Sequence, residues 1–176
     1  MWLGAAGCFL GGWLTDRYIR RTGDRKWGRK LFGIIGHSLC ALCYAGCLFM
    51  KTPFTFALLI SLGAFCNDLT MGSSWATCQD IGRKYTAIVA GFMNMIGNLG
   101  GAAAGWVTGA ILDSTLNVHA NAENLELSQM TKAQIDAGLM AGYQINFICF
   151  AGVYVLAVLF WLRIDATQPV VPEGDA

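Results

Sequence analysis

Twenty consecutive residues, 31–50, carry no charged side chain, and this run constrains the fold more than any other feature of the sequence. As an α-helix it would be about 30 Å long, which matches the hydrocarbon core of a bilayer. Four further apolar runs occupy residues 1–14, 54–77, 85–112 and 142–162, and none of the five contains a lysine or an arginine. The sequence therefore predicts an all-α membrane protein with about five transmembrane helices.

The first run, residues 1–14, is shorter than the roughly 20 residues that a spanning helix needs. It also lacks the basic segment with which a signal peptide begins. We therefore expect a truncated first helix, and we expect the chain to be a fragment of a larger membrane protein. Residues 1–163 would form one transmembrane bundle, and residues 164–176 a disordered tail.

A basic stretch, residues 11–30 (GGWLTDRYIRRTGDRKWGRK), holds seven of the twelve lysines and arginines. The polar segments after the first, third and last apolar runs contain ten of the twelve, and the other two polar segments contain two. Short loops rich in lysine and arginine stay on the cytoplasmic side, so this asymmetry predicts a cytoplasmic C-terminus in the plasma (inner) membrane. The alternative is a soluble helical protein that binds nucleic acid through a basic loop. It is disfavoured because charged residues make up only 13% of the chain.

The run 54–77 carries a polar pair, Asn67 and Asp68, near its middle. An ionisable side chain at that depth is costly and marks a functional site by default. Asp68, Gly72 and Trp75 share one helix face, which we expect to line a water-filled cavity. Asp68 is the candidate for binding a coupling ion, and Asn67 and Trp75 are candidates for binding substrate. Alternatively, the polar pair only forms hydrogen bonds between helices.

The run 85–112 carries two features with a four-residue period. Asn94 and Asn98 present two amides on one face, as further substrate-binding candidates or as hydrogen-bonding links between helices. Four glycines repeat at the same spacing and predict a surface on which another helix packs closely: Gly97, Gly101, Gly105 and Gly109.

Chemistry of other kinds finds little support. His37 shares a broad helix face with three cysteines, but one face cannot supply a tetrahedral metal shell, so we expect no metal site and no cofactor. The chain contains two histidines and no motif of a metalloprotease, a nucleotide-binding loop or a serine hydrolase. We therefore do not expect an enzyme.

The basic stretch also contains a motif. Gly12-x-Leu14-x-Asp16-Arg17, followed by Gly28-Arg29-Lys30, resembles the signature of the major facilitator superfamily. The ten residues between Arg17 and Gly28 resemble the longer copy of the signature between helices eight and nine of the anion:cation symporter branch, which includes hexuronate, galactonate, glucarate and phthalate permeases. The stretches 75–81, 91–101 and 142–147 resemble the end of helix ten, helix eleven and the start of helix twelve of that branch.

This resemblance implies a partial six-helix C-terminal bundle, helices eight to twelve, with the N-terminal half of the transporter missing. It implies that Gly12, Asp16, Arg17, Gly28 and Arg29 form a gate motif whose charges hold one conformation closed. It also implies that Asn94 reaches the substrate and that the glycine ladder packs against the missing half.

The function implied is secondary active transport of a small organic anion, a sugar acid or an aromatic acid, coupled to protons or sodium ions by alternating access. The partners would be that anion, the coupling cation, the lipid bilayer and the missing half, and no nucleic acid. A fragment of this kind would not transport alone. The competing hypothesis is a membrane sensor or scaffold that keeps the fold without transporting.

Overall fold

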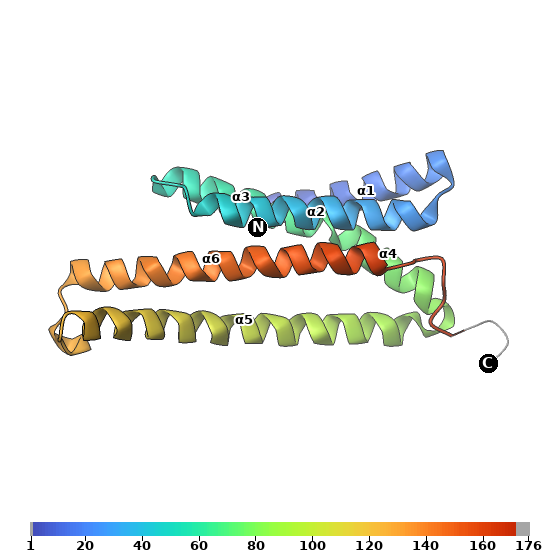
Figure 1. The fold of residues 1–176 in the computed structure, drawn as a ribbon. Helices are drawn as coiled ribbons and strands as arrows, with labels where there is room; N and C mark the ends of the chain where they lie inside the picture. The colour runs from blue at the N-terminus through green and yellow to red at the C-terminus, as the bar shows by residue number, and fades with distance from the viewer. Residues whose placement is uncertain (1, 172–176) are drawn as a thin grey trace.

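The computed structural model describes residues 2–171 and is helical almost throughout (Figure 1). Within these residues the elements follow one another as α1 (Trp2–Thr22), α2 (Arg25–Cys47), α3 (Pro53–Leu69), α4 (Met71–Gly82), η1 (Arg83–Tyr85), α5 (Thr86–Ala122), η2 (Leu127–Gln129) and α6 (Lys132–Arg163). The all-α prediction is confirmed.

The long helices run roughly parallel or antiparallel to one another, and the short helix α4 is inclined to them (Figure 1). Helices α1, α2 and α3 pack together, α6 lies between α2 and α5, and α4 crosses from α3 to the start of α5. The α1–α2 turn, the α4–α5 joint and the residues after α6 lie at one end, which we call the basic end. The α2–α3 and α5–α6 turns lie at the opposite, distal end. Segments predicted to share one side of the membrane therefore lie together.

Three continuous stretches are long and apolar enough to cross a membrane, by length and composition: Arg25–Cys47, Pro53–Ala122 and Lys132–Arg163. The second contains two antiparallel segments, because the chain reverses at η1 between α4 and α5 (Figure 1).

The basic stretch was predicted as a loop but is almost entirely helical. Only Gly23 and Asp24 separate α1 from α2. Gly23 has a φ of +70°, which glycine adopts without strain, and its N–H donates to the Ile19 carbonyl 2.8 Å away, ending α1. Asp24 then caps α2 by accepting from the Trp27 N–H at 2.9 Å. The basic side chains are therefore held on rigid helix ends.

The apolar run 54–77 was predicted as one helix, but the structure divides it at Thr70. The Thr70 N–H and the Thr70 hydroxyl both donate to the carbonyl of Asn67, at 3.1 and 2.8 Å. A threonine hydroxyl that takes a carbonyl from the helical ladder interrupts the regular pattern. The break therefore lies two residues after Asp68, between α3 and α4.

The polar segment 113–141, which separates the apolar runs 85–112 and 142–162, is mostly helical. Helix α5 continues to Ala122 and α6 begins at Lys132, because small residues of α6 pack on larger ones of α5. Gly138 lies against Leu116, and Gly142 lies against Leu112. Thr131 and Gln134 form a capping box and exchange hydrogen bonds at the start of α6.

The tail was expected to be disordered from residue 164, but residues 164–171 pack against the bundle. Ala166 is buried, Asp165 pairs with Lys26, and the Val170 N–H donates to the Ile81 carbonyl at 2.9 Å. Residues 172–176 lie outside the described part of the chain.

Small side chains fill the interior of the bundle, and large apolar side chains cover its outside. Buried residues include Thr15, Ser73 and five cysteines, whereas Phe54 and Trp106 are 77% and 76% exposed. In water this arrangement would be unfavourable, but a lipid surface accepts large apolar groups while small residues let helices approach closely. The arrangement therefore fits a membrane protein.

Helices α1 and α3 approach each other closely. A methyl group added at Gly7 would overlap the Phe65 carbonyl oxygen, and one added at Gly11 would overlap the Leu69 carbonyl oxygen. These small residues on one face of α1 let the backbones of α1 and α3 touch.

Gly11→Ala should destabilise the bundle by about 1–3 kcal/mol, because the added methyl group forces α1 away from α3. Gly100→Ala is the matched control, since a methyl group there meets nothing within 4 Å. Thermal unfolding in detergent micelles would measure both. Equal melting temperatures for the two variants would contradict this packing.

Candidate functional site

Arg29 connects three helices at the basic end. Its Nε donates to Asp80 Oδ2 at 2.8 Å, and its Nη1 donates to Asp16 Oδ1 at 3.4 Å. The side chains of Arg29 and Asp80 are only 12% and 14% exposed, whereas Asp16 is 62% exposed. Arg29 belongs to α2, Asp16 to α1 and Asp80 to α4, so one guanidinium group ties three helices together.

The neighbouring basic residues of α2 bind the end of α6. Lys30 is buried, and its Nζ donates to the Leu162 carbonyl at 2.9 Å, which neutralises the negative end of the α6 dipole. Lys26 Nζ forms an ion pair with Asp165 Oδ2 at 2.6 Å, and Arg25 lies 3.8 Å from Asp80 at a more exposed position. We call Asp16, Arg29 and Asp80, together with Arg25, the charge cluster.

The remaining signature residues serve the packing around this cluster. The Gly12 backbone contacts Gly72 of α4, where a Cβ added at Gly72 would lie 2.6 Å from the Gly12 Cα. Gly28 makes room for the side chain of Ile19. The Arg17 guanidinium lies 5.1 Å above the Trp13 ring, so Asp16 pairs with Arg29 and not with its neighbour Arg17.

A second polar group lies in the middle of the bundle, at the end of α3. Asn67 Nδ2 donates to Asp68 Oδ1 at 3.2 Å, and the Tyr154 hydroxyl of α6 donates to Asn67 Oδ1 at 3.2 Å. The Asp68 carboxylate is half-buried and touches α1, because a methyl group at Gly4 would overlap its Oδ2. The face of Asp68 and Gly72 therefore packs against α1, whereas we expected it to line a cavity.

The other predicted substrate residues lie on the outside of this chain. Trp75 of α4 is 40% exposed, and Asn94 and Asn98 of α5 are exposed. A contact of 3.3 Å between Cys78 Sγ and Met93 Sδ places Trp75 and Asn94 at similar heights on adjacent helices. Asn98 Nδ2 donates to the Asn94 carbonyl at 2.8 Å. These three side chains therefore lie on the adjacent helices α4 and α5, whereas Asn67 and Asp68 belong to α3.

The glycine ladder of α5 faces away from the rest of the described chain. A methyl group at Gly97, Gly101, Gly105 or Gly109 would meet nothing within 4 Å. Within residues 2–171 this surface therefore has no helix packed on it, in contrast to the glycine face of α1.

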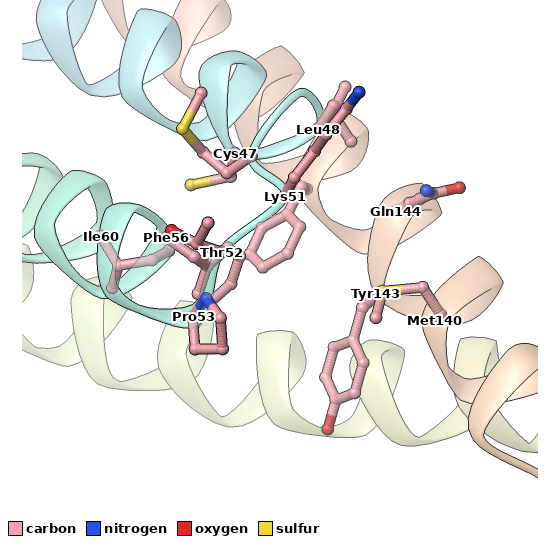
Figure 2. A pocket seen from close by; sticks show the side chains of 12 residues that line it. Cys47, Leu48, Lys51, Thr52, Pro53, Phe56, Ile60, Met140, Tyr143 and Gln144 are labelled. Atoms are coloured by element: carbon pink, nitrogen blue, oxygen red, sulfur yellow. The ribbon is translucent and has the colours of Figure 1, made fainter.

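A cavity at the distal end contains none of these residues. It measures about 560 Å³ and opens between the α2–α3 turn and the start of α6 (Figure 2). Its walls are mainly apolar and aromatic, with Lys51 and Gln144 at the polar positions. A polar cavity of about 450 Å³ lies beside the charge cluster and is lined by Arg25, Gln79 and Asp80 among others.

The geometry of the signature agrees with the comparison to known families. The sequence profile of the Major Facilitator Superfamily matches residues 1–105, which include the signature, the charge cluster and Asp68. The chain belongs to the major facilitator superfamily. Membership in this family of membrane transporters confirms the predicted resemblance to the superfamily. Membership in the anion:cation symporter branch stays a prediction.

One curated relative is similar to this chain over part of its length. The "Probable sulfoacetate transporter SauU" of Cupriavidus necator is 31% identical over 119 residues, which are 64% of this chain and 26% of that protein. The chain thus spans about a quarter of that relative. No solved structure matches the chain. Both matches are to membrane transport proteins and not to enzymes.

Sequence reasoning missed the residues that complete these groups. Asp80 was noted only as part of a resemblance, although an acid at the end of an apolar run, next to basic segments, indicates an ion pair. Tyr154 gave no signal, because a tyrosine inside an apolar run is also a common packing residue. The partner of Lys26, Asp165, was assigned to a disordered tail.

Arg29→Ala should destabilise the protein by about 3 kcal/mol, because Asp80 would stay 14% exposed without its closest cation. Arg25→Ala is the control and should cost less than about 1 kcal/mol, since Arg25 is 60% exposed. Thermal unfolding in detergent would compare them. Equal losses would show that Arg29 is no more than a surface charge.

The tail contact should depend on pH. The Lys26 ammonium group, aided by the Thr167 hydroxyl and N–H, holds the pKa of Asp165 well below its usual value. A depressed carboxyl pKa stabilises the fold above the ordinary value of 3.8 and loses this effect as the pH falls. Wild type should therefore melt above Asp165→Asn at about pH 6, and the difference should shrink at about pH 3. A difference that stays constant with pH would contradict the ion pair, and Asp136→Asn, at an exposed acid, is the control.

Proposed function

We propose that this chain is part of the C-terminal helical bundle of a secondary transporter in the plasma (inner) membrane, with its C-terminus cytoplasmic. The transporter carries a small organic anion, coupled to protons or sodium ions, by alternating access. Membership in the superfamily supports transport, and the excess of basic residues at one end of the bundle supports the orientation.

The observation that carries the coupling proposal is Asp68. It is an acid in the middle of a predicted span, it is half-buried, and within the described residues it forms no ion pair. A carboxylate that is not neutralised by a fixed cation can bind and release a proton or a sodium ion. A purely structural side chain at this depth would be stabler as a neutral amide.

The substrate class follows from charge and from the relative. Sulfoacetate, named for the relative, is a small organic anion. The apolar runs of this chain offer no lysine or arginine, so the cations that bind an anion would come from another part of the transporter. We propose that Trp75, Asn94 and Asn98 contribute an indole and two amides to that site, because all three are exposed and lie on adjacent helices.

Alternating access requires surfaces that separate and rejoin. We assign the glycine ladder of α5 to the surface that packs against the N-terminal half, because it has no partner within the described chain. We also propose that the charge cluster stabilises one of the two conformations, because Arg29 joins α1, α2 and α4 through its ion pairs.

Uptake by the full-length transporter in proteoliposomes tests this proposal. A pH or sodium gradient should drive accumulation of at least one radiolabelled anion among sulfoacetate, glucuronate and phthalate. Asp68→Asn should lower gradient-driven accumulation more than about tenfold, because the ion-binding carboxylate is lost. Asp136→Asn removes an exposed acid of α6 and should transport like wild type.

Failure to accumulate any of the three anions would contradict the substrate class. Accumulation that ignores both gradients would contradict coupling. Asp68→Asn with unchanged gradient-driven uptake would remove Asp68 from the mechanism.

A further inference from the structure

Three arginines at the end of α1 take no part in the ion pairs of the basic end. Arg17, Arg20 and Arg21 are exposed, and within residues 2–171 none of them lies within ion-pair distance of a carboxylate. The four basic residues at the start of α2 differ, because each binds a carboxylate or a carbonyl of this chain. The basic stretch therefore divides into an internal set on α2 and an outward set on α1.

The two carboxylates nearest to the outward set in sequence have other partners. Asp16 pairs with Arg29 at 3.4 Å, although it stands four residues before Arg20, a spacing at which opposite charges attract on a helix. Asp24 accepts from the Trp27 N–H at 2.9 Å and caps α2. Neither acid therefore forms an ion pair with the outward set.

The three arginines lie on one face of α1. Their spacing of three and four residues places them together on a helix, and Trp13 lies one turn before Arg17 on the same face. The Arg17 guanidinium lies 5.1 Å from the centre of the Trp13 ring, which is 44% exposed. Tryptophan is enriched at the boundary between lipid and water. This face therefore combines three cations with an aromatic ring suited to the membrane interface.

The other side of the same helical turns is fixed to α2. The Tyr18 ring meets Phe32 edge to face with centroids 6.4 Å apart, and the Ile19 side chain fills the space left by Gly28. Helix α1 continues to Thr22, so all three arginines stand on regular helix. A partner that binds them has little backbone to order, which lowers the entropy cost of binding.

The last turns of α1 lie at the basic end of the bundle (Figure 1). The ion pair between Asp16 and Arg29 places them beside a residue that comes two positions before the uncharged run 31–50. That run has the length of the hydrocarbon core, so its start marks the edge of the core. Trp13 and Arg17 therefore lie at the level of the lipid headgroups.

We propose that Arg17, Arg20 and Arg21 form a binding site for the headgroup of an anionic phospholipid. A guanidinium group donates two parallel hydrogen bonds to a phosphate, and basic side chains beside a membrane attract anionic lipids. The Trp13 ring packs against the apolar part of the lipid next to its headgroup. The proposal does not depend on Asp68 or on which solute is carried.

Native mass spectrometry of the full-length transporter in detergent micelles tests this site. The protein is titrated with phosphatidylglycerol, which is anionic, and separately with phosphatidylcholine of the same chain length, which is zwitterionic. Wild type should bind phosphatidylglycerol more tightly. Arg20→Gln/Arg21→Gln should weaken phosphatidylglycerol binding more than about tenfold, because two of the three guanidinium groups are lost, and should leave phosphatidylcholine binding unchanged.

A double lysine variant is the matched control. Lys51→Gln/Lys132→Gln removes two exposed lysines at the distal end, and within the described part of the chain neither forms an ion pair. It changes the net charge by the same amount and should bind phosphatidylglycerol like wild type. Phosphatidylglycerol should also raise the melting temperature of wild type more than that of the arginine variant, because a ligand stabilises the folded protein that binds it.

A soluble phosphate has the same oxygens as a lipid headgroup but no acyl chain. An excess of sodium phosphate should therefore leave phosphatidylglycerol bound to wild type. Displacement of the lipid by sodium phosphate would assign the three arginines to a soluble anion and overturn the lipid site.

Three other results would overturn the proposal. Equal affinities of wild type for the two lipids would exclude recognition of the anionic headgroup. Phosphatidylglycerol binding that Arg20→Gln/Arg21→Gln leaves unchanged would exclude these arginines. An equal loss in the lysine variant would show attraction by net charge without a site on α1. None of these results bears on uptake by Asp68→Asn, so the failure of the proposed function is recognised separately.

Discussion

The structure depends on a guanidinium group that is withdrawn from solvent between two carboxylates. Arg29 is 12% exposed, and such a charge is tolerated only when paired and hydrogen-bonded. Asp80 of α4 and Asp16 of α1 meet this requirement from opposite sides. Because the three residues belong to three helices, satisfying one charge fixes the relative positions of α1, α2 and α4. On the same turn of α2, Lys30 binds the end of α6 and Lys26 binds Asp165 just after it. This turn therefore contacts every helix that reaches the charge cluster and also α6.

Away from this end, the helices are held by close approach and not by charge. Glycines of α1 allow the backbone of α3 to touch, and cysteine, serine and threonine fill the remaining interfaces. In lipid there is little hydrophobic gain from burying a large side chain, so van der Waals contact and short polar links dominate. The Thr15–Ser73 hydroxyl contact at 2.9 Å is one such link, between α1 and α4. Within residues 2–171 the same kind of surface on α5 has no helix packed on it, in contrast to the interface between α1 and α3.

The membrane helices and their orientation could be predicted from the sequence, because the bilayer limits both the length of an apolar helix and the position of charged residues. The uncharged run 31–50 is enough to predict a membrane helix. The concentration of basic residues in the polar segments after the first, third and last apolar runs predicts that these segments lie on one side of the membrane. The signature residues predicted the superfamily. Local caps were harder: Gly23-Asp24 ends one helix and starts the next, yet the charges around them suggested a loop.

Contacts between distant residues could not be predicted. Asp80 and Arg29 are 51 positions apart, and Tyr154 and Asn67 are 87 apart. A single sequence gives their types but not their distance. The same limit explains the face of Asp68, since helical periodicity groups Asp68 with Gly72 but does not say which neighbour they meet.

Helix α4 has an interruption at each end. Thr70 breaks the helix before it, and Arg83 follows it with a φ of +48°, a strained conformation for a side chain with a Cβ. Between them lies a rod of twelve residues, about 18 Å long. Asp68 sits just beyond one end of this rod, and Asp80 sits near the other. Helix α4 is therefore the direct covalent connection between the polar group at the end of α3 and the charge cluster at the basic end.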